Sequence, residues 1–171
     1  MHARNHVAAY TLVEVLVVVL VLMIIAAIVV PSLVPGQDSQ VTSAARIVAS
    51  DLETARSMAV TTLVPHSLVF SDDLTAYKVA ANYGGGDYAS AVAIAHPVRV
   101  GSDYVVVPAA QNGMAGVTVV AVDFGGRTYV TFNSQGEPSS PGSITLRAGQ
   151  FQVAVSVEVL TGNITVSNMT D

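Results

Sequence analysis

The sequence has no cysteine among its 171 residues, so no disulfide framework supports the fold, and this absence fits either side of a membrane. Charged residues make up only 11% of the chain, and the formal net charge is -5. The basic residues form no cluster along the sequence. Because nucleic-acid binding needs a basic patch that neutralises phosphates, we do not expect nucleic acid as a partner.

Sequence signatures of enzymes and metal sites are also missing. No serine lies in a G-x-S-x-G motif. His66 and His96 each stand beside a proline at the edge of a predicted strand, where we expect an exposed or hydrogen-bonded ring. The acids Asp72 and Asp73 do not follow the spacing of a calcium-binding loop, and the glycines at 84–86 read as a flexible hairpin tip rather than a phosphate cradle. The sequence therefore predicts no enzyme activity, no metal and no cofactor.

A long apolar run is the most prominent feature that is present. It extends without a charge from Val15 to Val30 and is preceded by a single acid, Glu14. The segment 10–34 is long enough for a helix of about 30 Å, the thickness of the hydrocarbon core of a bilayer. Its residues are apolar on every side, which favours lipid or an all-apolar helix bundle. We predict a transmembrane helix with a kink at Pro31.

Glu14 is the exception in this segment, because a carboxylate in apolar surroundings needs a partner or a proton unless it lies at the membrane interface. The residues A-Y-T-L-V-E at 9–14 resemble the prepilin processing motif of type IV pilins and type II secretion pseudopilins. In that family a short basic leader ends in a small residue, usually Gly, and cleavage precedes an aromatic residue, usually Phe. The resemblance implies a leader peptide at 1–9, cleavage between Ala9 and Tyr10, and N-methylation of Tyr10.

The resemblance also implies two roles for Glu14. It matches the glutamate that the family needs for N-methylation, and the one that pairs with the N-terminal amine of a neighbouring subunit during assembly. A buried carboxylate beside a buried ammonium offsets part of the desolvation cost of both groups. The implied partners are a prepilin peptidase/methylase and other pilins or pseudopilins, through the N-terminal helix.

Helical periodicity returns at residues 37–61, where apolar residues recur at spacings of three and four. We predict an amphipathic continuation of the N-terminal helix, with one face on a domain. Asp38 or Ser39 is placed to cap its start. We expect Arg56 to be a solvated cation near the helix end, where it favours the helix dipole.

After this helix the pattern changes to short strands between turns. The predicted strands are 66–70, 76–81, 91–95, 104–107, 117–124, 127–133, 143–147, 151–160 and 164–167. Residues 51–70 and the end of the chain, with its N-x-x-G turn at 133–136, resemble the GspH/FimT group of minor pseudopilins. The predicted fold is α+β and pilin-like: a long N-terminal transmembrane-plus-amphipathic helix packed on an antiparallel β-sheet domain at 62–171.

These resemblances imply a structural minor pseudopilin, which is processed and then assembled into a type II secretion pseudopilus or a type IV pilus. Arg4 precedes the apolar run and the next basic residue is Arg46. This asymmetry predicts a single-pass inner-membrane protein with a cytoplasmic N-terminus and a periplasmic C-terminal domain. Two alternatives stay open: a DNA-binding FimT-like minor pilin for DNA uptake, and a membrane-anchored extracytoplasmic binding domain outside any filament.

Overall fold

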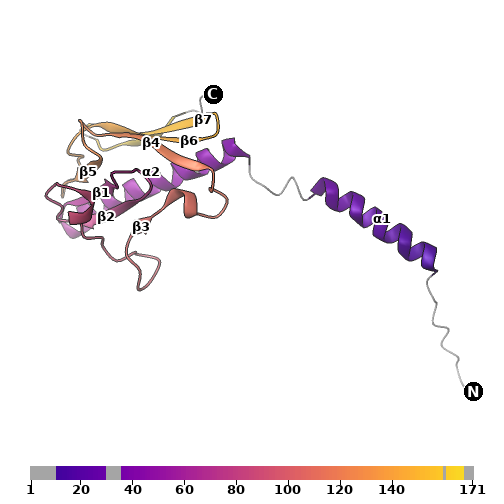
Figure 1. Ribbon diagram of the computed structural model, residues 1–171. Coiled ribbons are helices and arrows are strands. Elements are labelled where there is room, and N and C mark those ends of the chain that lie inside the picture. The colour runs from indigo at the N-terminus through magenta and orange to yellow at the C-terminus, as the bar shows by residue number, and fades with distance from the viewer. Residues whose placement is uncertain (1–10, 30–35, 160, 168–171) are drawn as a thin grey trace, which may run out of the picture. The chain divides into compact units, whose positions relative to one another are not determined.

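The structure, a computed structural model, describes residues 11–29, 36–159 and 161–167. Ala9, Tyr10 and Pro31 therefore lie outside the described residues. The chain divides into two compact units, Met1–Pro35 and Gly36–Asp171 (Figure 1).

The first unit contains helix α1, Leu12–Val29. The backbone amide of Glu14 donates to Thr11 Oγ1 at 3.2 Å, which satisfies one of the amides left free at a helix start. Among the helices in residues 11–29 and 36–159, none combines the length and apolarity that a membrane span requires.

The second unit begins with helix α2, Gln37–Thr62, close to the predicted bounds. Leu63 adopts a left-handed conformation at φ 58 and ends the helix, and Pro65 follows in the turn before the first strand. The predicted caps were wrong: the helix starts before Asp38 and Ser39, and Gly36 stands at the N-cap with no side-chain bond. Asp38 instead lies in the first turn, where its charge favours the helix dipole.

Two four-stranded antiparallel sheets pack on α2, which contacts strands of both (Figure 1). The first sheet has the order β3-β2-β1-β5, with β1 His66–Phe70, β2 Tyr77–Ala81, β3 Val105–Val106 and β5 Tyr129–Phe132. The second has the order β4-β6-β7-β8, with β4 Val117–Asp123, β6 Gly142–Ala148, β7 Phe151–Val157 and β8 Ile164–Val166. This arrangement confirms the predicted pilin-like α+β fold.

The core forms where the apolar stripe of α2 meets the inner faces of the sheets. Along β6 and β7, fully buried side chains such as Ile144, Leu146 and Val155 alternate with partly exposed ones such as Thr145 and Ala154. This period of two places one face of the second sheet on the core and leaves the other to solvent.

The predicted strand at 91–95 was wrong. The segment forms only isolated bridges, Ala80↔Ala93 and Ala95↔Asp103. The edge of β2 is already shared with β3, and Pro97 cannot donate to a ladder, so a single residue pairs there. The glycines at 84–86 are not a hairpin tip either, because they lead into the short 3-10 helix η2, Tyr88–Ser90.

Candidate assembly site and the polar contacts of the globular unit

Glu14 lies in the first turn of α1, where the partial positive charge of the helix start favours a carboxylate. It follows the Thr11 cap by three residues, which is the spacing of a capping box. The predicted cleavage and methylation positions, Ala9 and Tyr10, and the predicted kink at Pro31 are outside the described residues, so these roles stay predictions.

Apart from Glu14, the surface of α1 is apolar. All side chains from Leu12 to Ala27 are exposed, and the valines and leucines between them form no one-sided stripe. An apolar helix of this kind needs lipid or other helices around it.

Asp51 is a buried acid of the globular unit, and the sequence analysis missed it. Its side chain is 9% exposed, and its two oxygens accept hydrogen bonds from different tyrosines. Tyr77 donates to Oδ2 at 2.5 Å, and Tyr104 donates to Oδ1 at 2.8 Å. A signal was available, because Asp51 falls on the apolar stripe of α2, four residues before Ala55.

Burial governs the titration of this cluster. It raises the pKa of Asp51 above its usual value, and the two tyrosine hydrogen bonds offset part of that shift. Burial and the neighbouring carboxylate raise the pKa of Tyr77 and of Tyr104 well above 10.0. The tyrosines therefore remain neutral donors, and the cluster joins α2 to β2 and to the segment before β3.

The rings of His66 and His96 are held by hydrogen bonds, as expected, although the segment before His96 is not a strand. His66 Nδ1 lies 2.8 Å from Val64 O. His96 Nδ1 accepts from the amides of Val98 and Arg99, both at 3.1 Å. The His96 ring also packs on Tyr104, with 4.4 Å between ring centroids.

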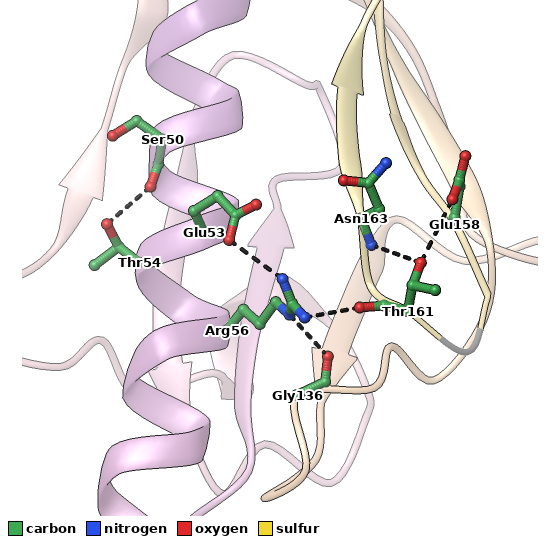
Figure 2. Close-up of polar contacts among 8 residues, drawn as sticks. All are labelled: Ser50, Glu53, Thr54, Arg56, Gly136, Glu158, Thr161 and Asn163. Carbon is green, nitrogen blue, oxygen red and sulfur yellow. Dashed lines mark hydrogen bonds and ion pairs between the residues drawn. The ribbon is translucent and has the colours of Figure 1, made fainter.

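The prediction that Arg56 is a solvated cation near the helix end was wrong, because its guanidinium is hydrogen-bonded to two distant carbonyls. Its Nε donates to Gly136 O at 3.1 Å and its Nη2 donates to Thr161 O at 2.7 Å (Figure 2). A weaker ion pair joins Nη1 to Glu53 at 3.6 Å on the same helix. Figure 2 shows the guanidinium reaching from α2 to the turn before β6 and to the turn before β8. The prediction failed because both carbonyl partners are far away in the sequence.

Gly162 is needed for this close approach. Its φ is +62, and a Cβ there would lie 2.5 Å from Gly136 O and 3.0 Å from Arg56 Nε. Arg56 and the two glycines belong to the stretches that resemble the GspH/FimT group, and these stretches meet at this point.

In the described ranges, no group of three His, Asp or Glu side chains is placed to hold a metal ion. The carboxylate of Asp73 stabilises the turn at 71–75. Its Oδ1 accepts hydrogen bonds from Ser71 Oγ at 2.6 Å, from Thr75 Oγ1 at 2.9 Å and from Thr75 N at 3.1 Å. These hydrogen bonds lower the pKa of Asp73.

Comparison with known proteins agrees with this architecture. The family model of type II transport protein GspH matches residues 44–162, and the prokaryotic N-terminal methylation motif matches residues 4–30. No curated protein sequence matches the chain.

Solved structures of pilin-like proteins share the fold. The minor pseudopilin EpsH from the type II secretion system of Vibrio cholerae is similar with a TM-score of 0.56 and 9% identity, over 80% of this chain and 99% of that chain. The type IV minor pilin FimU of Pseudomonas aeruginosa is similar with a TM-score of 0.51 and 18% identity, over 74% of this chain and 92% of that chain. The family model covers more than half of the sequence, and the chain therefore belongs to the GspH family of type II transport proteins, with the N-terminal methylation motif of pilin-like proteins.

Proposed function

We propose that this protein is a structural minor pseudopilin. In this role a prepilin peptidase removes residues 1–9 and the new N-terminal residue, Tyr10, is methylated. The apolar N-terminal segment anchors the chain in the inner membrane, with the N-terminus in the cytoplasm and the globular unit in the periplasm. The mature chain then enters a type II secretion pseudopilus or a type IV pilus. The observation that carries the proposal is the methylation motif at 4–30, which contains the apolar helix α1 with its exposed side chains.

Glu14 is the residue on which assembly depends in this proposal. Cleavage before Tyr10 creates an ammonium group close to the start of α1. When α1 is surrounded by other apolar helices, that ammonium needs an anion, and Glu14 is the acid that the segment carries. Leaving one member of a buried ion pair alone costs about 3–5 kcal/mol.

The test is crosslinking of Glu14 variants to co-expressed pilin subunits in the membrane. We expect Glu14→Val to insert into the membrane and to be cleaved, but to lose most of its crosslinks. Glu14→Asp, whose side chain is one methylene shorter, should be intermediate. Val17→Ala on the same helix serves as the matched control and should crosslink like the wild type. Intact mass of the extracted protein reports cleavage between Ala9 and Tyr10 and the added methyl group.

Two outcomes would contradict the proposal. If Glu14→Val crosslinks as well as the wild type, the carboxylate is not a pairing group. If the mass shows a retained leader, or cleavage after Pro31, the chain is not processed as a prepilin. Either of these two mass results would favour a membrane-anchored binding domain outside any filament.

The other alternative is a minor pilin that binds DNA. We expect this protein not to bind DNA. Arg147 is the basic residue nearest to the end of the chain, and acids outnumber bases in the sequence. A gel shift over a salt titration tests it, because phosphate contacts weaken steeply with salt.

A further inference from the structure

The exposed edges of the two sheets are not equally protected against pairing. β3 and β8 are short, with two and three residues. The outer side of β5 is occupied, because Ser139 N donates to Thr131 O at 2.7 Å and Phe132 bridges to Pro138. β4 has seven residues, V-T-V-V-A-V-D, without lysine, proline or glycine, and in the described chain it pairs only with β6. A long apolar edge of this kind is a template for another strand.

A groove runs beside the first part of this edge. It has a volume of about 230 Å³, and we call it the β4 groove. Three short segments line it: Asp73-Leu74-Thr75, Val107-Pro108-Ala109 and Val117-Thr118-Val119. The last residue of β4 in its lining is Val119, and a bulge shifts the register of β4 between Val119 and Ala121. Pockets for drug-sized ligands are usually larger, about 300–1,000 Å³, so this groove suits a few side chains of an extended peptide better than a cofactor.

The wall opposite β4 is held in place before anything binds. Leu74 has a left-handed backbone with φ 55, which is uncommon for a residue other than glycine. The hydrogen bonds of Asp73 Oδ1 to Ser71 and Thr75 hold this turn. A preformed wall lowers the ordering cost of binding.

The charge of the groove indicates which chemistry fits. Asp73 is the only ionisable residue in its lining. Asp123 is the last residue of β4, and Asp73 lies beside the first residues of β4. If β4 paired antiparallel with the β4 of a second copy, Asp123 of one copy would approach Asp73 of the other. Such like charges disfavour self-association and favour a basic partner.

We propose that the β4 groove binds an extended, β-branched segment of a partner protein, which adds as a strand to β4 and places a lysine or arginine beside Asp73. This interaction concerns the globular unit alone and does not depend on processing or on Glu14.

The experiment titrates two short peptides into the full chain, isotope-labelled in detergent micelles. One is acetyl-TVKVTV-amide, and the other is its acidic counterpart acetyl-TVEVTV-amide. Backbone amide shifts are followed by NMR. We expect saturable shifts at residues 72–75, 107–109 and 117–119, and binding of the lysine peptide about tenfold tighter than that of the glutamate peptide.

Matched variants separate the groove from its surroundings. Ala109→Arg fills the groove and should weaken the lysine peptide about tenfold or more, whereas Ala110→Arg, next to it but outside the lining, should not. Asp73→Asn keeps an acceptor for the turn and should remove the preference for lysine, whereas Asp72→Asn should keep it.

Several results would overturn the proposal. These are the absence of saturable shifts up to about 1 mM peptide, equal affinity for the two peptides, and equal effects of the Ala109 and Ala110 variants. Shifts of 117–123 that depend on protein concentration without any peptide would assign the edge to a second copy instead.

Discussion

The buried carboxylate of Asp51 has the clearest consequence for pH. Its raised pKa means that the folded state binds the proton more tightly than the unfolded state does. The stability linked to this proton is fully present below the usual value of 3.8 and is lost as the pH rises through the raised pKa. Asparagine has the same shape and no ionisable proton, so its stability does not fall with pH in this way.

We therefore predict that Asp51→Asn gains stability relative to the wild type as the pH rises from 4 to 7. Thermal unfolding of both proteins at the two pH values measures the difference. An Asp51→Asn effect that is the same at both values would show that burial does not control this proton. Asp51→Ala should be less stable at either pH, by about 1–3 kcal/mol, because two buried tyrosine hydroxyls lose their acceptors.

At the level of the elements, Arg56 connects α2 with two turns that precede different strands. Hydrogen bonds from a charged donor contribute about 1.5–3 kcal/mol when buried, and the side chain here is one-third exposed, so we expect Arg56→Ala to cost about 1–2 kcal/mol. Arg56→Lys keeps the charge but cannot bind both carbonyls with a fork, so its loss should be intermediate. Urea unfolding measures these losses.

The control for Arg56 is Arg46 on the same helix, which is exposed. Arg46→Ala should change the free energy of unfolding by less than about 0.5 kcal/mol. If both alanine variants lose the same amount, the carbonyl contacts of Arg56 contribute nothing beyond a surface charge.

Elements with strong local patterns were predictable. The apolar stripe of 37–61 predicted the bounds of α2 to within one residue. The alternation of apolar and polar residues predicted β6 and β7, because burial there alternates from one residue to the next. Thr11 and Glu14 at the start of α1 were likewise visible as part of a motif.

Features that depend on distant partners could not be predicted in the same way. Asp51 is held by hydroxyls 26 and 53 residues further along the chain, and Arg56 by carbonyls 80 and 105 residues further along. The segment 91–95 had a strand-like pattern, but β3 pairs with the first two residues of β2, and the segment adds only the isolated bridge Ala80↔Ala93 beside them. Local propensity yields to tertiary context in such cases.

For the whole molecule, we predict that residues 37–171 alone form a soluble, folded, sheet-rich domain. The core residues of this unit come from α2 and the sheets, and the contacts divide the chain at Gly36. Circular dichroism and a cooperative thermal transition check this prediction. A spectrum dominated by unfolded chain would mean that the core is not self-sufficient.

The reach of Arg56 also sets an order of events during synthesis. Its second carbonyl partner, Thr161, is added 105 residues later. At about 5–20 residues per second, a ribosome needs on the order of 5–20 s to cover that interval. During this time the strands that pack on α2 emerge one after another, and β6 and β7, at Gly142–Ala148 and Phe151–Val157, emerge only near its end. The nascent chain is therefore most open to aggregation or to a chaperone before β6 and β7 emerge, and a stop codon shortly before residue 161 would remove both β8 and the Thr161 contact of Arg56.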